Sequence, residues 1–315
     1  METINLNKKN LKSYIYDEKI NGDNPGSILR RIFYFYQCII NHGRGSLKYH
    51  QICTPKLSIS YINTFKKTPS RLLCDGFWNT LNYTNLKFQL GNKLSIFDVG
   101  CGSGKYGNFL KKLSGKAFSS YSGLDIYKHH EYPQEFFHFK DTAENIGKYI
   151  NKETNFVISQ SALEHIKYDL YVIEEITKKL NETKKPFIQI HMLPATRCLW
   201  LYLWHGYRQY SYKNLSFILN HINKNFNLNS SIIPIGGDGS FWFHLKNITL
   251  PVYFGKLIFN RKLYEWYNHE SIEEKISKVV SKELLCKEKK PIFWALIITS
   301  KNINIKNIFT KNNNE

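Results

Sequence analysis

From about residue 93 onward, short apolar runs alternate with stretches in which apolar residues follow a helical spacing. The apolar runs predict strands at 96–99, 155–160, 186–191, 232–235 and 291–301, and two further strands that end near 126 and 140. Strands that alternate with helices form a parallel sheet covered on both faces, and ligands gather at the carboxyl ends of such strands. The pattern therefore predicts an α/β fold with a mostly parallel sheet.

The first 92 residues follow a different pattern. Residues 1–24 are polar, whereas 27–41 is apolar with two arginines and predicts a helix. Packing of this helix on the core is favoured over a position on a membrane surface, because aromatic stripes usually mean burial. A second helix is predicted from Pro69, with apolar residues at helical spacing, namely Leu72, Leu73, Phe77, Trp78 and Leu81.

Three glycines, Gly100, Gly102 and Gly104, follow the first predicted strand and precede a helix. Glycine allows close approach to a ligand, and the N-terminus of a helix presents free N–H groups. Asp125 lies where a second strand ends, and a carboxylate there can accept hydrogen bonds from two ribose hydroxyls. Together these residues predict a nucleotide-like ligand.

Other interpretations of the turn are weaker. A phosphate-binding loop of nucleotide hydrolases needs Ser or Thr after the Gly-Lys pair, and Tyr106 stands there. The dinucleotide fingerprint is matched only in the frame that starts at Gly102, but its first glycine should follow the strand directly. A turn that binds nothing is disfavoured by Asp125.

The string Asp98-Val99-Gly100-Cys101-Gly102-Ser103-Gly104 resembles motif I of class I S-adenosylmethionine-dependent methyltransferases, and Leu163-Glu164-His165-Ile166 resembles the string common after their fourth strand. The resemblance covers about 93–301 and implies a Rossmann-like seven-stranded sheet, with S-adenosyl-L-methionine as cofactor. It implies that the cofactor is held by a set of eight residues, namely Asp98, Gly100, Gly102, Gly104, Asp125, Asp141, Thr142 and Ser159.

The same resemblance divides the chain. Residues 1–92 become an N-terminal extension and helical cover, and 93–301 the methyltransferase domain. An insertion at about 238–290 precedes the last strand, and 302–315 is a polar tail. Specificity for the acceptor is expected in the insertion, because members of the family differ most in such additions.

Composition limits the class of protein. The chain has 315 residues, 42% of them hydrophobic, which is ample for a core. Its 6 cysteines form no C-x-x-C pair, so neither a metal site nor a disulfide framework is indicated. No signal core or long apolar run occurs, so a cytoplasmic protein with no transmembrane segment is expected, and peripheral membrane contact stays open. The net charge of +19 is compatible with nucleic acid, but the lysines are dispersed in Lys- and Asn-rich stretches, and biased composition is the favoured cause.

Methyl transfer to a hydroxyl group needs a base near the departing proton. His191 is the first candidate, because it is expected just past the fifth strand, and His165 and His205 follow. Each of these histidines could instead be a hydrogen-bonded structural residue. No metal is required by this chemistry.

The segment 197–210 is rich in aromatic and basic residues and, with the Leu-Glu-His-Ile string, resembles methyltransferases of bacterial surface-polysaccharide biosynthesis. Trp200, Leu201 and Leu203 are expected to pack on the core, whereas a ligand is expected to meet Trp204, His205, Tyr207 and Arg208. The resemblance implies O-methylation of a sugar or other small acceptor. An RNA methyltransferase and a non-catalytic protein that keeps the cofactor-binding fold are the alternatives.

Overall fold

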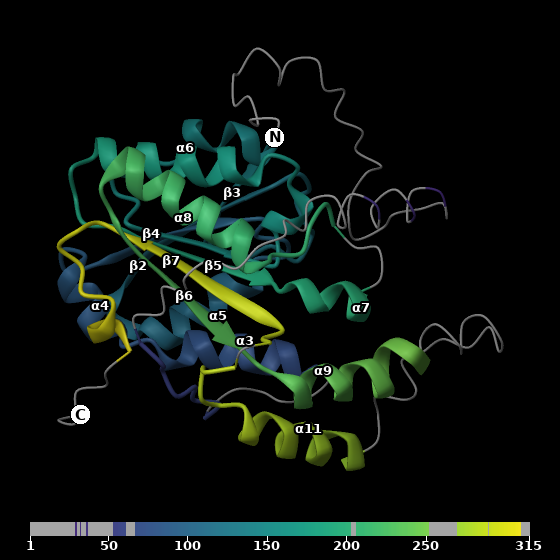
Figure 1. The fold of residues 1–315 in the computed structure, drawn as a ribbon. Coiled ribbons are helices and arrows are strands. Elements are labelled where there is room, and N and C mark those ends of the chain that lie inside the picture. The colour runs from purple at the N-terminus through teal and green to yellow at the C-terminus, as the bar shows by residue number, and fades with distance from the viewer. Residues whose placement is uncertain are drawn as a thin grey trace.

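The computed structural model describes residues 29, 32, 36, 53–60, 67–202, 206–251, 270–288 and 290–309. A seven-stranded sheet runs through this part of the protein (Figure 1). Its strands are, in chain order, β1 (Leu94–Val99), β2 (Phe118–Asp125), β3 (Phe137–Lys140), β4 (Phe156–Gln160), β5 (Ile188–Pro194), β6 (Asn229–Ile235) and β7 (Phe293–Thr299). In the sheet they lie in the order β3-β2-β1-β4-β5-β7-β6, and β7 runs antiparallel to both neighbours while the other pairs are parallel. The predicted α/β class with a mostly parallel sheet is confirmed.

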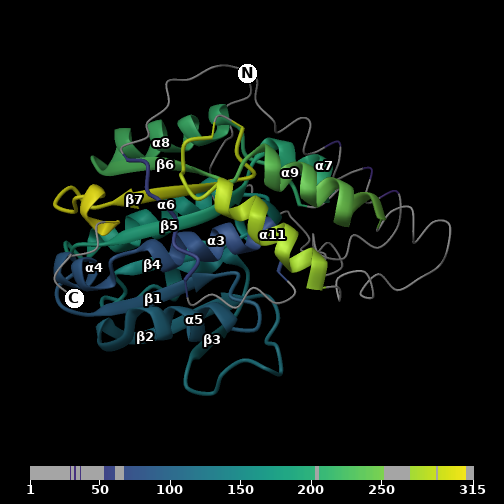
Figure 2. The same ribbon diagram turned by 90° about the horizontal axis from the view of Figure 1, so that it is seen from below.

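Helices cover both faces of the sheet, as Figures 1 and 2 show. One face carries α3 (Pro69–Thr80), α4 (Tyr83–Gln89), α5 (Lys105–Ser114), α9 (Asp238–His244) and α11 (Glu270–Lys282). The other carries α6 (Asp169–Glu182) and α8 (Tyr212–Phe226). Successive strand residues point to opposite faces, so that Ile158 joins the first apolar cluster and Val157 the second. The inner strands β1, β4, β5 and β7 are buried along their whole length, and for this reason they are mostly apolar, whereas β3 at the edge of the sheet is partly exposed.

The strand order reverses between β1 and β4. From β1 the chain first moves outward to β2 and β3, then returns to β4 on the other side of β1 and continues to β5. The two crossover connections therefore leave the sheet in opposite directions, and ligands of such sheets bind beside the carboxyl ends of the strands at this switch point. The glycine turn follows β1 at this edge.

The helix predicted from Pro69 and the helix predicted after the glycine turn are both present in the structure. α3 begins at Pro69, where the Thr68 side chain accepts a hydrogen bond from the Arg71 N–H, at 3.2 Å. α5 ends at Ser114, and Gly115 follows with φ of +50°. The helix predicted over 27–41 lies outside the described residues, apart from Leu29, Ile32 and Tyr36, which are helical and exposed.

Between β6 and β7 the chain forms α9, a π-helical turn (Leu245–Thr249) and α11. The Thr249 hydroxyl donates to the Leu201 carbonyl over 2.8 Å and so ties this segment to α7 (Leu199–Tyr202). Short 3-10 turns complete the described chain at Gly115–Ala117, Ala143–Lys148, Leu163–His165, Thr196–Cys198 and Lys306–Ile308. None of the helices within the described ranges is long and apolar enough to cross a membrane.

Candidate cofactor and acceptor site

The glycine turn after β1 has the left-handed backbone that its sequence predicts. Gly100, Gly102 and Gly104 have φ of +74°, +51° and +72°. The Gly100 N–H donates to the Leu124 carbonyl over 2.8 Å, and a Cβ on Gly100 would collide with the Cβ of Ala162. A Cβ on Gly102, by contrast, would meet nothing within 4 Å. Gly100 is therefore required by packing, whereas Gly102 borders open space.

The Asp125 carboxylate lies against this turn. Its Oδ2 accepts a hydrogen bond from the Gly102 N–H at 2.8 Å, and its Oδ1 accepts one from the Tyr127 N–H at 3.2 Å. Its backbone carbonyl accepts from the Asp141 N–H at 3.2 Å. Because each carboxylate oxygen has two lone pairs, Asp125 keeps acceptor capacity for ligand hydroxyls. The structure thus brings together the predicted residues that follow β1, β2 and β3.

Asp98 is buried in β1 and has one satisfied carboxylate oxygen. The Tyr121 hydroxyl donates to its Oδ2 over 2.6 Å, whereas Oδ1 is buried with no hydrogen-bond partner among the described residues. Burial raises the pKa of Asp98 to about 7, against the lowering effect of the Tyr121 hydrogen bond, and the Asp125 charge raises it further. An acceptor that is buried without a protein partner marks a position where a polar group of a ligand can bind.

Asp141 stabilises the turn that follows β3. Its carboxylate accepts hydrogen bonds from the Thr142 N–H, the Asn145 amide and the Tyr149 hydroxyl, at 2.7, 2.9 and 2.7 Å. Burial acts to raise its pKa, but these three hydrogen bonds outweigh burial and lower it. Asp141 and Thr142 therefore lie beside Asp125, with most of the Asp141 acceptor capacity already used within the protein.

Ser159 and His191 lie elsewhere than expected. β5 continues to Pro194, so His191 lies inside the strand and not past its end, and it is fully buried. Its Nδ1 contacts the Ser159 hydroxyl at 2.9 Å and its Nε2 contacts the side-chain Oε1 of Gln189 at 3.2 Å, while the Gln189 Nε2 donates to the Thr177 hydroxyl of α6. Burial lowers the pKa of His191 to about 3. The pair belongs to a hydrogen-bond network on the α6 side of the sheet, on the face opposite to Asp98.

His165 remains at the carboxyl edge of the sheet. It follows β4 in the Leu163–His165 turn, its side chain is 17% exposed, and its Nε2 lies 3.9 Å from Oε1 of the buried Glu164. Leu203, Trp204 and His205 lie outside the described residues. Of the three histidines predicted as bases, His165 is the one that the structure places, partly exposed, at the edge of the sheet where the glycine turn lies.

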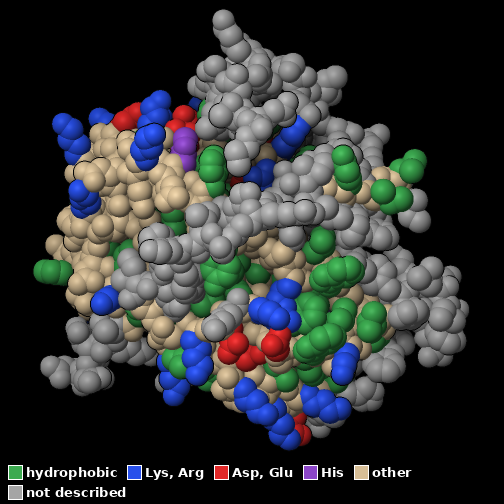
Figure 3. Space-filling model, viewed as in Figure 1, with side chains coloured by type: hydrophobic (Ala, Val, Ile, Leu, Met, Phe, Trp, Pro, Cys, Tyr) green, Lys and Arg blue, Asp and Glu red, His purple; other side chains and the backbone are tan. Residues whose placement is uncertain are grey.

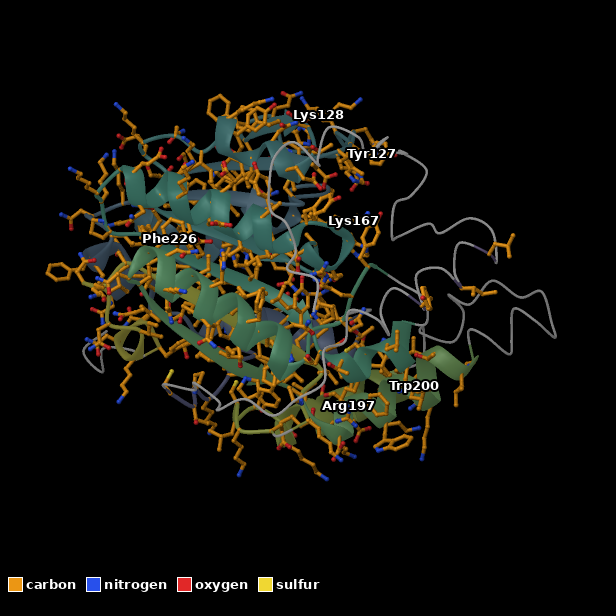
Figure 4. The ribbon with its side chains drawn as sticks, turned by 45° about the horizontal axis from the view of Figure 1, so that its top comes forward. Tyr127, Lys128, Lys167, Arg197, Trp200 and Phe226 are labelled. Carbon is orange, nitrogen blue, oxygen red and sulfur yellow. The ribbon has the colours of Figure 1, made fainter. Side chains whose placement is uncertain are left out.

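The aromatic segment after β5 differs from its prediction in two places. Leu201 is buried as expected, but Trp200 is 58% exposed. Arg208, which was expected to meet a ligand, pairs through its guanidinium with the buried Asp169 at 2.7 Å, and Tyr210 donates to the same carboxylate. Trp200 lies with Tyr127, Lys128, Lys167 and Arg197 along one edge of the molecule, and Phe226 lies at the opposite edge (Figure 4).

A hydrophobic patch covers part of this region. Trp200 of α7 and Trp242 of α9 are 58% and 51% exposed, and Leu250 follows the π-helical turn that contacts both helices. Hydrophobic side chains gather over these helices on the face shown in Figure 3. Arg197 holds α9 in place, because its guanidinium lies 4.1 Å from the Phe241 ring centroid and pairs with Asp238 at 2.7 Å.

Several residues of the site carry no sequence signal. The Trp78 indole N–H of α3 donates to the Gln160 Oε1 over 2.8 Å. Tyr106, at the start of α5, donates to the buried Asp75 over 2.7 Å and so joins α3 to the glycine turn. Tyr132 and Pro133 pack over Gly104. Only contacts between segments distant in sequence reveal these residues.

No protein-family model and no curated protein matches the chain. Solved structures are similar in fold. The plantazolicin methyltransferase BamL, in complex with a triazolic desmethylPZN analog and SAH, is 14% identical over 74% of this chain and 86% of its own, with a TM-score of 0.47. A SAM-dependent methyltransferase from Archaeoglobus fulgidus is 16% identical over 75% and 96%, at 0.42. A putative sarcosine dimethylglycine methyltransferase from Galdieria sulphuraria is 13% identical over 86% and 98%, at 0.46.

Proposed function

We propose that this protein is an S-adenosylmethionine-dependent methyltransferase. One observation carries the proposal: at the switch point of the sheet, the Asp125 carboxylate is fixed by the Gly102 N–H, beside a glycine whose Cβ position opens into free space. A preoriented carboxylate next to a glycine turn suits a ribose with two hydroxyls. The turn differs from a phosphate loop, because Tyr106 replaces the Ser or Thr of that motif.

The residues present fit the cofactor along its length. Asp125 would accept hydrogen bonds from the ribose hydroxyls. The orphan Oδ1 of Asp98 would accept one from the amino group of the methionine end, which removes the cost of leaving that atom buried without a partner. Asp141 and Thr142, which contact Asp125 through the Asp141 N–H, would border the adenine.

When bound, S-adenosylmethionine supplies a methyl group on a positively charged sulfur. The chain's own task is to align the acceptor, exclude water and receive a proton where the acceptor is a hydroxyl. We assign the base to His165, which is partly exposed beside Glu164 at the carboxyl edge. We assign His191 and Ser159 to the structure of the sheet, because both are fully buried and bonded to each other.

For the acceptor we propose a small hydroxyl-bearing molecule, with a sugar of surface-glycan biosynthesis as the first candidate. The exposed Trp200 ring of α7, the helix that follows β5, supports this choice, since aromatic faces stack on apolar sugar faces. The charge of +19 is the one feature that favours RNA.

Titration calorimetry tests the cofactor. The protein should bind S-adenosylmethionine and S-adenosylhomocysteine, and NAD and ATP should bind far more weakly. Asp125→Ala should weaken binding by about 10- to 100-fold, because hydrogen bonds to a charged group contribute about 1.5–3 kcal/mol. Asp238→Ala is the matched control, since Asp238 pairs with Arg197 far from β2, and it should bind as the wild type does. Equal affinity in the Asp125 variant would refute the assignment.

Methyl transfer tests the acceptor. Nucleotide-sugar and lipid-linked sugar pools are offered beside total RNA, and the labelled product is identified. Transfer to a small sugar should depend little on salt, whereas binding to RNA phosphates would fall steeply between about 50 and 200 mM salt. Methylated RNA as the product would refute the small-molecule proposal. Cofactor binding without transfer to any pool would favour the non-catalytic alternative.

A further inference from the structure

Gln160 ends β4 at the switch point, on the same face of the sheet as Asp98. In the β1–β4 register Asp98 is opposite Ile158, and Gln160 is two residues further on, so both side chains point to the side of α3 and α5. Ser161 follows with φ of +53°, a conformation that is uncommon for a residue other than glycine and that clusters at functional sites.

The orientation of the Gln160 amide is set by Trp78. An indole N–H can only donate, so the atom that it contacts at 2.8 Å must be the amide oxygen. The amide nitrogen Nε2 therefore points away from Trp78. Gln160 is 9% exposed, and Nε2 is buried without a nitrogen or oxygen hydrogen-bond partner among the described residues. A hydrogen bond from the Gln160 amide acts to lower the pKa of the Cys74 thiol, but sulfur is a weak acceptor and the amide carries two N–H bonds, so Nε2 keeps donor capacity for a ligand.

Resting on the methyltransferase function proposed above, we propose that Gln160, oriented by Trp78, selects an oxygen nucleophile over an amine. Its Nε2–H donates to the acceptor's oxygen, which makes Gln160 a specificity-determining residue.

The selection follows from lone pairs. An acceptor oxygen has at least two, so one can attack the methyl carbon while another accepts the hydrogen bond from Gln160. A neutral amine has a single lone pair, which the attack itself requires, and an ammonium ion would place N–H groups against an N–H donor. A site with a buried donor rejects a ligand that cannot accept from it, because the donor is left unpaired.

The transfer balances with the groups already named. The O–CH₃ bond forms as the S–CH₃ bond breaks, the bonding pair returns to sulfur to give a neutral thioether, and the hydroxyl proton passes to His165. The hydrogen bond from Gln160 also favours the ionised form of the oxygen as that proton leaves. Gln160 itself gains and loses no proton.

A pair of cofactor analogues tests the proposal without a known acceptor. Sinefungin carries an amine where S-adenosylmethionine carries its reactive methyl, and S-adenosylhomocysteine carries nothing there. The wild type should bind S-adenosylhomocysteine more tightly than sinefungin. Gln160→Glu, measured at pH 8.5 so that the new carboxyl is ionised, should shift the affinity ratio toward sinefungin by about 10- to 100-fold.

Gln89→Glu is the matched control. Gln89 ends α4, its Oε1 accepts from the Asn304 N–H, and its Nε2 is also buried without a partner, but it precedes β1 at the other edge of the sheet. This variant should keep the wild-type ratio. Trp78→Phe supplies a second measurement, because it frees the Gln160 amide to turn its oxygen toward the ligand, and it should shift the ratio in the same direction.

The outcomes separate the two proposals. If neither analogue binds the wild type, the methyltransferase proposal fails. If the wild type binds S-adenosylhomocysteine but binds sinefungin equally well or better, or if Gln160→Glu leaves the ratio unchanged, the role of Gln160 is refuted. If Gln160→Glu does not fold, an unchanged ratio in Trp78→Phe refutes it.

Discussion

Alanine at two glycines of the turn, compared with alanine at a third glycine outside it, gives the most direct test of the site, because the three positions share a backbone conformation and differ in their surroundings. Gly100, Gly102 and Gly91 all have positive φ, at +74°, +51° and +86°. Gly91 lies in the loop before β1, outside the site. Alanine in the left-handed region costs about 1–2 kcal/mol, and this cost is common to the three variants.

The atoms around each added Cβ decide how much further stability each variant loses. A Cβ on Gly100 would overlap Ala162, and overpacking of this kind adds about 1–3 kcal/mol, for a total of about 2–5 kcal/mol. A Cβ on Gly102 or Gly91 meets nothing within 4 Å, so no packing cost is added. Gly102→Ala should therefore lose as much stability as Gly91→Ala, and Gly100→Ala clearly more.

Ligand binding then distinguishes Gly102 from Gly91. A methyl group on Gly102 would occupy the open space assigned to the cofactor, and a steric cost of about 1–3 kcal/mol weakens binding about 5- to 150-fold. Gly91→Ala should leave affinity unchanged. Urea unfolding gives the stabilities and calorimetry with S-adenosylhomocysteine the affinities. If Gly102→Ala binds as Gly91→Ala does, the cofactor does not lie against Gly102, and if Gly100→Ala is as stable as Gly91→Ala, the contact with Ala162 is wrong.

Four further predictions concern buried charge and the exposed edge. Burial raises the pKa of Asp98 from 3.8 to about 7, so between these pH values the folded state holds a proton that the unfolded state has released. The free energy of unfolding should therefore fall by on the order of 4 kcal/mol as pH rises from about 4 to about 7. Urea unfolding across this range should show that slope, and Asp98→Asn should abolish it. Burial lowers the pKa of His191 to about 3, so its effect has the opposite sign, and stability should fall as pH drops from about 6.5 toward 3. The difference in unfolding free energy between the wild type and His191→Phe, plotted against pH, should show this fall. A flat difference curve would contradict a buried neutral ring. Arg208→Met should lower the free energy of unfolding by about 3–5 kcal/mol because it leaves the buried Asp169 carboxylate without its ion-pair partner, and the added change Asp169→Asn should recover part of this loss. Trp200→Ala should change the stability measured by thermal unfolding by no more than about 0.5 kcal/mol, because the Trp200 ring is exposed.

Local sequence determined the position of most elements. The proline at the start of α3, the glycine after α5 and the apolar runs of the strands each act within a few residues, so they are visible without the fold. The glycine turn and Asp125 were predictable for the same reason, since a strand that ends in glycines and a strand that ends in a carboxylate must meet when both belong to one parallel sheet.

The length of β5 was harder to predict. The sequence suggests that the strand ends at His191, because histidine is polar and a loop with Pro194 follows. In the structure, β7 pairs with β5 as far as Pro194 ↔ Phe293, and this pairing extends the strand past the histidine. His191 then has hydrogen-bond partners in Ser159 of β4 and Gln189 of β5, so its ring nitrogens do not require water. A partner strand about 100 residues away in sequence thus decided the environment of this candidate base.

By itself, then, the sequence determined an α/β chain and predicted a site for a nucleotide-like ligand after its first strand, because hydrophobic period, glycine conformation and strand ends are local properties. The tertiary structure decided which polar side chains share a face of the sheet. It buried Ser159 with His191, paired Arg208 with Asp169, and set the orientation of the Gln160 amide through a hydrogen bond from the Trp78 indole. Each of these assignments depends on which segment packs beside which, and the partners of a buried polar group are set by that packing and not by its neighbours in sequence.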